Sequence, residues 1–281
     1  MFKRDHHNRI QTLLSALNTD FLVQNQCFFG GGTAIVLALD EYRESVDIDF
    51  LCASQDGYRA LRNTIDNGSL GEIFARPVEL ARDVRADRYG IRTFLRVDDV
   101  PVKFEIVSEG RIQIEGAMNP KTGVPTLARA DMYAEKLLAN ADRYRDKAVA
   151  SRDIIDLAMM VGHWGPVPEA AWEKVRKAYG PSADKAYQGA IEMVGDRAYL
   201  SQCLAKMHMA PGLVDQIPAV LRGEYSFAPA AKQVSENAPG AIATAARGLR
   251  AVYDRALSAP AAAAPDAGER DQSTSSRPQG R

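Results

Sequence analysis

The most informative part of the chain reads Gly30-Gly31-Gly32-Thr33-Ala34 and, shortly afterwards, Arg43-Glu44-Ser45-Val46-Asp47-Ile48-Asp49-Phe50. In the second segment apolar residues alternate with Asp47 and Asp49, which is the period-two pattern of a β-strand with one buried face. Both carboxylates then leave the same face of the strand. A glycine run ahead of a helix lets backbone N–H groups come close to a phosphate. The sequence therefore predicts a phosphate-binding turn opposite an acidic strand.

The acidic pair is a candidate metal site. Two neighbouring carboxylates repel each other unless a cation lies between them. Mg²⁺ suits such a pair because it binds a few carboxylates and completes its shell with water and phosphate, and Mn²⁺ accepts the same oxygen ligands. An isolated Asp-x-Asp is more often the solvated face of an ordinary strand. The nearby glycine run favours the metal site over that simpler interpretation.

A third carboxylate is available on a second strand. Residues 90–97 and 100–107 have the alternating pattern of a β-hairpin. In the second strand, Lys103 and Glu105 share the face opposite the apolar one. If this strand lies beside the acidic strand in register, Glu105 joins the acidic pair as a metal ligand. Otherwise it belongs to a surface face of Lys and Glu side chains.

The chain changes character after the turn-rich segment at residues 119–125. Before this segment the pattern predicts a mixed structure, with helices near residues 6–17, 33–39 and 58–65, a turn into a short strand at 21–29, and another short strand at Ile112 and Ile114. After it, apolar spacing predicts helices alone, at residues 131–144, 151–164, 169–179 and within 182–207. Ser151 is expected to cap the second of these helices.

This organisation predicts an α+β fold. Residues 1–118 are expected to form a mixed α/β domain and residues 119–258 a helical domain. Residues 259–281 are expected to be a disordered tail, because they have too little apolar content to fold.

Composition excludes two classes of protein. The chain is 46% hydrophobic and 25% charged, and no apolar stretch approaches the ~18 residues needed to span a membrane. The N-terminus lacks the apolar segment of a signal peptide, so we expect a cytoplasmic protein. The formal net charge of −1 excludes a general polyanion binder, so any nucleic acid must be held by a local basic patch.

Two parts of the sequence resemble a known family. The run Gly-Gly-Thr-Ala followed by Arg-x-Ser-x-Asp-Ile-Asp-Phe is similar to the motif of the AbiEii/MenT nucleotidyltransferase toxins, which belong to the polymerase-beta nucleotidyltransferase superfamily. The helical half resembles the same family at Ala134-Glu135-Lys136-Leu137 and at Ser151-Arg152-Asp153-Ile154-Ile155-Asp156-Leu157. The resemblance covers roughly residues 25–165.

The resemblance implies a fold and a set of residue roles. The fold is a polymerase-beta-type nucleotidyltransferase domain with a mixed β-sheet, followed by an all-helical domain. The implied nucleotide-binding residues are Gly31, Gly32, Thr33, Ser45 and Lys136. The implied catalytic residues are Asp47, Asp49, Glu105, Lys136 and Asp153, of which Asp47, Asp49 and Glu105 hold the metal.

Three of these roles need comment. The superfamily more commonly has aspartate at the position of Glu105. Lys136 is implied to contact the triphosphate as a flexible point charge. Asp156 shares a helix face with Asp153 and is an alternative for the last acid.

The resemblance also implies a reaction and its partners. The implied activity is transfer of a nucleotide from an NTP to the 3′ end of tRNA, with a cognate antitoxin as the physiological partner. The acceptor could instead be a hydroxyl of a protein or a small molecule. A third alternative is a non-catalytic descendant that binds nucleotide or RNA.

A basic cluster beside the proposed site is a candidate for RNA binding. It consists of Arg143, Arg145, Lys147 and Arg152. Such side chains can hold RNA phosphates. Asp142 and Asp146 are interleaved with them, which favours an ordinary solvated surface equally well.

Overall fold

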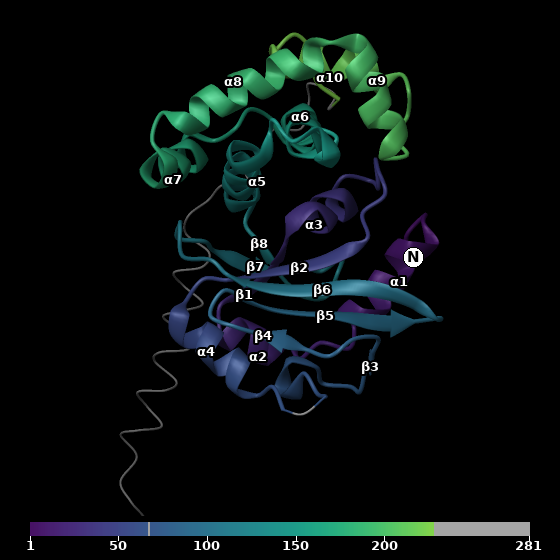
Figure 1. The fold of residues 1–281 in the computed structure, drawn as a ribbon, viewed down its shortest axis with the longest axis vertical. Coiled ribbons are helices and arrows are strands. Elements are labelled where there is room, and N and C mark those ends of the chain that lie inside the picture. The colour runs from purple at the N-terminus through teal and green to yellow at the C-terminus, as the bar shows by residue number, and fades with distance from the viewer. Residues whose placement is uncertain (67, 228–281) are drawn as a thin grey trace, which may run out of the picture. The chain divides into compact units, whose positions relative to one another are not determined.

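The computed structural model describes residues 1–66 and 68–227, which are coloured in Figure 1. The tail predicted at residues 259–281 and the end of the predicted helical domain lie outside the described residues. Met1–Pro229 forms one compact unit. Within the described residues, every helix is too short or too polar to span a lipid bilayer.

The centre of this unit is an eight-stranded mixed sheet with the strand order β3-β5-β6-β2-β1-β8-β7, in which β4 also pairs with β5. The pairs β2–β6 and β1–β8 are parallel and the others antiparallel. The strands are β1 Cys27–Gly30, β2 Asp47–Cys52, β3 Glu79–Leu80, β4 Arg85–Ala86, β5 Gly90–Val97, β6 Val100–Ser108, β7 Gly116–Met118 and β8 Pro125–Leu127.

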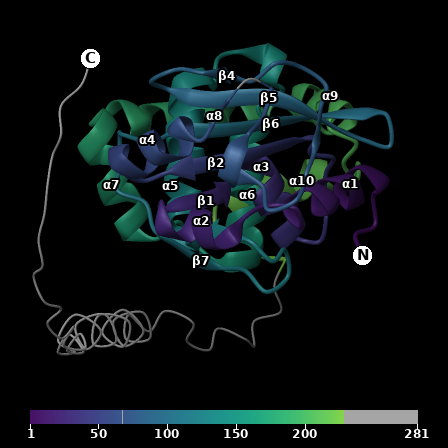
Figure 2. The same ribbon diagram turned by 90° about the horizontal axis from the view of Figure 1, so that it is seen from below.

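Helices cover the sheet. The first four are α1 Asp5–Leu14, α2 Thr19–Gln24, α3 Gly31–Ala38 and α4 Gln55–Asn63. After β8 come α5 Arg129–Arg143, α6 Arg152–Trp164, α7 Glu169–Tyr179, α8 Ser182–Gly195, α9 Arg197–Lys206 and α10 Leu213–Leu221, and the short 3₁₀ turns are Gly71–Ile73 and Lys147–Val149. In Figure 1, α3, α5 and α6 lie on one face of the sheet, and α2 and α4 lie on the other. Figures 1 and 2 both place α1 and α7 at opposite ends of the sheet.

The acidic strand has the alternation that its sequence predicts. In β2, Ile48, Phe50 and Cys52 are fully buried, whereas Asp47 and Asp49 are only half-buried. The ring of Phe50 packs between Phe29 of β1 and Phe104 of β6, with ring centroids 5.5 and 6.1 Å away. Burying a side chain of this size contributes ~1.5–3 kcal/mol. This apolar face holds the strand in place and leaves its other face for the two carboxylates.

Several predicted elements are confirmed. The hairpin predicted at residues 90–97 and 100–107 is β5–β6, and its second strand lies parallel to β2. The helices predicted at residues 131–144, 151–164 and 169–179 are α5, α6 and α7. The overall class is a mixed α/β structure with a mixed sheet. The domain division at residues 118 and 119 remains a proposal, and its boundary falls between β7 and β8.

Two local predictions were wrong. Ile112 and Ile114 are buried but form no strand, because the edge of β8 pairs only with Gly116–Met118. The turn into a short strand predicted at residues 21–29 is confirmed only for its strand, β1; its first residues belong to α2, which begins where the Asn18 side chain accepts a hydrogen bond from the N–H group of Phe21.

Candidate active site

A cleft of about 460 Å³ lies between the acidic face of the sheet and α5. Most of the residues singled out in the sequence line it: Gly31, Gly32, Ser45, Asp47, Asp49, Glu105, Lys136, Arg143 and Arg152. Five others do not, namely Thr33, Asp153, Asp156, Arg145 and Lys147. The structure therefore brings together the glycine turn, the acidic strands and Lys136.

The carboxylates of Asp47 and Asp49 face this cleft without a compensating partner. Neither forms a hydrogen bond or ion pair within residues 1–66 and 68–227. Burial, together with repulsion from Asp47 and Glu105, raises the pKa of Asp49 to about 6, although Lys103 opposes the rise. A partly buried carboxylate without a partner suits a divalent cation, which would remove this repulsion.

Glu105 is placed beside Asp49 but is already neutralised. The parallel register pairs Asp49 with Glu105, as the alternation of the two strands predicted. The Glu105 carboxylate accepts hydrogen bonds from Arg92 Nε and Lys103 Nζ, both at 2.5 Å. Burial alone would raise the pKa of Glu105, but these two cations outweigh it and lower the pKa.

The donor set therefore fits a metal through two carboxylates more readily than through three. Among the described residues no group of three or more His, Cys, Asp and Glu side chains is arranged to hold a metal ion. Asp47 and Asp49 are available as ligands, whereas Glu105 would have to exchange one of its cations first.

The glycine turn packs closely against the side chains of Asp49 and Arg43. Gly31 has a φ of +66°, which favours glycine, and a Cβ there would lie 2.5 Å from Oδ2 of Asp49. A Cβ on Gly32 would lie 2.5 Å from a terminal nitrogen of Arg43. Side chains at these two positions would fill the space between α3 and the acidic strand. The absence of side chains keeps the backbone open to the cleft.

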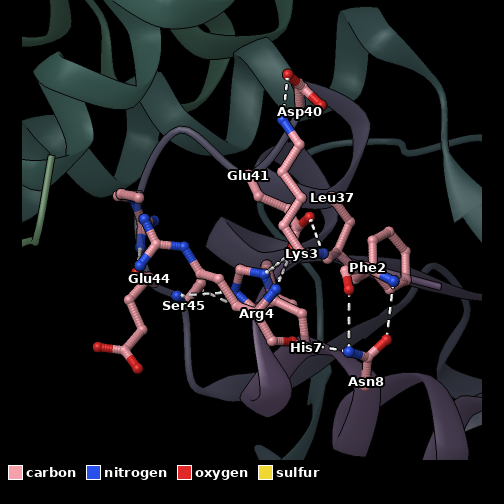
Figure 3. A network of polar contacts seen from close by, with 12 residues as sticks. Phe2, Lys3, Arg4, His7, Asn8, Leu37, Asp40, Glu41, Glu44 and Ser45 are labelled. Atoms are coloured by element: carbon pink, nitrogen blue, oxygen red, sulfur yellow. Dashed lines mark hydrogen bonds and ion pairs between the residues drawn. The ribbon is translucent and has the colours of Figure 1, made fainter. Parts of the chain in front are cut away.

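The backbone of Ser45 is held in place by His7 of the N-terminal segment (Figure 3). The N–H group of Ser45 donates to Nε2 of the fully buried His7, at 3.2 Å, and Nδ1 of His7 lies 2.6 Å from the carboxylate of Glu41. Because Nε2 accepts, the ring proton lies on Nδ1 and is donated to Glu41. Burial lowers the pKa of His7 and keeps the ring neutral, although Glu41 opposes this. Thr33 Oγ1 lies 2.8 Å from Ser45 Oγ, so Thr33 supports the serine rather than lining the cleft.

Lys136 belongs to a buried cluster of charges. Its Nζ lies 3.0 Å from Asp153 and 2.8 Å from Asp156. Arg43 pairs twice with Asp156, at 2.7 and 2.9 Å, and Arg143 pairs twice with Asp153, at 2.7 and 3.0 Å. Three cations thus share two carboxylates, and the cluster keeps a net positive charge on the side of the cleft opposite the acidic strand.

This geometry defines what the two acids of α6 touch. Asp153 and Asp156 are both buried and do not line the cleft. Burial alone would raise the pKa of Asp156, but Arg43 and Lys136 outweigh it and hold the pKa well below its usual range. Both acids hold cations in fixed positions, and both hold Lys136.

The predicted basic cluster divides into two parts. Arg143 and Arg152 line the cleft. Arg145 instead lies over the ring of Tyr144, at 5.3 Å from its centroid, and Lys147 lies over the ring of Tyr199, at 5.9 Å.

Sequence reasoning missed several residues of the cleft. Arg43 opens the second quoted segment, two residues before Ser45, and this position could have indicated that it lies in the cleft. Lys103 shares the strand face of Glu105, which the alternation had already shown. Arg111 and Glu135 also line the cleft, where they contact each other at 3.0 Å. Glu135 stands beside Lys136 in the quoted motif, whereas Arg111 lies in a loop for which the sequence offers no local pattern.

Together, the mixed sheet, the glycine turn and the acidic strand define a nucleotidyltransferase-like site. The chain matches the family model described as "Nucleotidyl transferase AbiEii toxin, Type IV TA system" over residues 12–227. This chain therefore belongs to the AbiEii family of nucleotidyltransferase toxins from type IV toxin–antitoxin systems. Membership implies a nucleotide substrate and an antitoxin partner.

Other comparisons add little. No curated protein matches the chain closely enough to extend this assignment. The crystal structure of JHP933 from Helicobacter pylori is similar over 90% of this chain and 100% of that chain, with a TM-score of 0.46 and 14% identity. The Megavirus polyadenylate synthase is similar over 75% of this chain and 36% of that chain, with a TM-score of 0.23 and 10% identity. The family assignment rests on the sequence match, because likenesses at these TM-scores are too weak to support it.

Proposed function

We propose that this protein is a metal-dependent nucleotidyltransferase of the cytoplasm that transfers NMP from an NTP to the 3′ end of tRNA and releases pyrophosphate. The observation that supports it best is the cleft in which the unpartnered carboxylates of Asp47 and Asp49 face Lys136 across the glycine turn. A modified 3′ end cannot be aminoacylated, so translation and growth would stop. The antitoxin implied by the family would oppose this effect.

Asp47 and Asp49 would hold Mg²⁺ or Mn²⁺, and Glu105 would join them after giving up Lys103 or Arg92. When bound, the metal supplies positive charge to the reacting phosphate and to the oxygens that enter and leave it. Lys103, once released, is close enough to the acidic strand to neutralise a phosphate in the same cleft.

The remaining residues of the cleft would position the NTP. The open backbone at Gly31 and Gly32 admits the phosphates. Lys136, held by two carboxylates, presents its charge to the triphosphate in one orientation. Phosphoryl transfer depends mainly on positioning and charge neutralisation, and these residues supply both without forming a covalent bond to the substrate.

Incubation of the full chain with Mg²⁺, total RNA and each α-labelled NTP in turn tests the proposal. We expect label in tRNA and an equal amount of released pyrophosphate. Label confined to protein or to a small molecule would favour those acceptors instead. RNA binding without any label transfer would favour a non-catalytic descendant.

Lys136→Ala is expected to raise the NTP concentration required for half-maximal rate by ~10- to 100-fold, because it removes a charged contact worth about 1.5–3 kcal/mol. Lys136→Arg should restore only part of the loss, since the guanidinium is larger and planar. Steady-state kinetics over a range of NTP concentrations measures the effect. If Lys136→Ala leaves both KM and kcat unchanged, Lys136 supports the fold and does not contact the triphosphate.

A further inference from the structure

A second hollow of about 960 Å³ lies next to the catalytic cleft. It is formed by the C-terminal end of α5, the loop that follows, and the facing ends of α7 and α8. Its lining includes Arg143, Tyr144, Arg145, Tyr179 and Lys185. Neither the acidic strand nor the glycine turn contributes to it, so it is separate from the proposed nucleotide site.

Two arginines connect the hollow to the cleft. Arg143 lines both spaces and is fixed by its double pairing with Asp153. Arg111 lines the cleft, and its Nη1 lies 3.4 Å from the hydroxyl of Tyr179, which lines the hollow. A chain that lay in the hollow could therefore pass Arg143 directly into the cleft.

Two cations of the lining form no ion pair with a described residue. Arg145 and Lys185 are exposed and form no ion pair within the part of the chain that the structure describes. Asp142 and Asp146 also line the hollow and keep their negative charges, but both carboxylates accept hydrogen bonds from other groups. Asp142 accepts hydrogen bonds from Tyr179 and Arg111, and Asp146 accepts one from the N–H group of Ala148.

Half-buried aromatic rings accompany these cations. Tyr144 packs against Gly189 of α8 and carries the guanidinium of Arg145 over its ring. Tyr179 is held by its hydroxyl group to Asp142 at 2.7 Å, which fixes its ring at the rim of the hollow. Cations that follow a groove, together with aromatic side chains that stack on bases, are the means by which proteins bind single-stranded nucleic acid without sequence preference.

We propose that this hollow binds the single-stranded 3′ end of the RNA acceptor. Arg145, which lies over the ring of Tyr144, and Lys185 contact its phosphates, Tyr179 stacks on a base, and the terminal hydroxyl passes Arg143 into the cleft. A protein partner would need an apolar centre. The large exposed apolar side chains of the described residues, such as Val23, Val46 and Met118, lie outside the hollow. The proposal rests on the proposed function for its acceptor, but its binding step can be measured without catalysis.

The test measures binding of a fluorescein-labelled, single-stranded RNA octamer to the full chain by anisotropy, without NTP. The double variant Arg145→Glu, Lys185→Glu is expected to bind at least about tenfold more weakly than the wild type, and the slope of log affinity against log salt should fall by about 1.4 for two lost phosphate contacts. The matched control is Arg59→Glu, Arg62→Glu, which makes the same change of charge on α4, on the other face of the sheet. This control is expected to change binding less than twofold. Thermal melting confirms that both variants are folded.

A second variant tests stacking. Tyr179→Ala is expected to weaken binding of the octamer by ~5- to 100-fold, whereas Tyr179→Phe, which keeps the ring but loses the bond to Asp142, should keep most of the affinity. The proposal is overturned if the wild type does not bind the octamer, if the hollow and control variants lose affinity equally, or if the hollow variant binds normally. These results do not depend on the proposed function. A hollow that binds the octamer in a protein that never labels RNA would support the binding site and refute nucleotide transfer to RNA.

Discussion

Asp49→Asn is expected to fold as the wild type does and to transfer nucleotide at least ~10³-fold more slowly, because it removes charge stabilisation of the transition state. The Asp49 carboxylate has no partner within the described residues and faces Asp47 and Glu105. The isosteric amide keeps the shape of the cleft but removes the negative charge that the metal requires. Turnover close to that of the wild type would contradict the metal-site assignment.

The change in stability caused by Asp49→Asn provides an independent check of the metal-site assignment. Burial raises the pKa of Asp49 to about 6, whereas an aspartate in an unfolded chain has a pKa of about 3.9. In the metal-free protein, ionisation of Asp49 therefore lowers the free energy of unfolding as the pH rises through this interval. At pH 7 without metal, Asp49→Asn should melt no lower than the wild type. With Mg²⁺ the wild type should gain stability and the variant should not.

A matched control is available on α4. Asp56 is an exposed aspartate paired with Arg59 at 2.9 Å. Asp56→Asn makes the same chemical change far from the cleft and should leave rate and Mg²⁺ response unchanged. A similar loss of rate in both variants would show that the effect is not specific to the acidic strand.

The elements that carry the site could be predicted from sequence because their patterns are local. The alternation in β2 and β6 specifies which side chains are buried, and a shift of one residue would expose Phe50 and Phe104. This requirement fixes the faces of the two strands, whereas the structure supplies the parallel register that places Glu105 beside Asp49. The helix carrying Lys136 follows from apolar spacing in the same way.

The side-chain partners could not be predicted because they join distant segments. Arg43 and Asp156 are 113 residues apart, and no periodic pattern connects a loop residue to a helix of the other half of the chain. Glu105 is the exception, because its partner Arg92 lies directly opposite it in the β5–β6 hairpin that the sequence predicts. Local patterns determine which face a side chain leaves, whereas its partner depends on how the elements pack.

Ser151 illustrates the same limit at a helix terminus. Its position before α6 predicted a side-chain cap, but the residue has a left-handed conformation and makes no capping hydrogen bond. Its hydroxyl instead lies 2.8 Å from the hydroxyl of Tyr199 on α9. A tertiary contact has replaced the local one, and the sequence around Ser151 contains no sign of α9.

Asp156→Asn is expected to lower the free energy of unfolding by about 3–5 kcal/mol, because it leaves buried cations without their counter-charge. Asp156 is fully buried and accepts from Arg43, Lys136 and Tyr42. Asp153→Asn is the matched comparison. Asp153 shares Lys136 with Asp156, and its other partner, Arg143, is 36% exposed and can be solvated. The loss in that variant should therefore be smaller.

Urea denaturation of the two variants at several pH values separates this explanation from a general loss of packing. The depressed pKa of Asp156 means that its contribution is complete above the unfolded value of about 3.9 and is lost as the pH falls below it. The difference between wild type and Asp156→Asn should therefore be largest near neutral pH and shrink in acid. A difference that is independent of pH would mean that shape matters more than charge at this position. Equal losses in Asp153→Asn would mean that the two carboxylates are interchangeable. We do not expect this, because Arg143, the partner of Asp153, is more exposed than Arg43, the partner of Asp156.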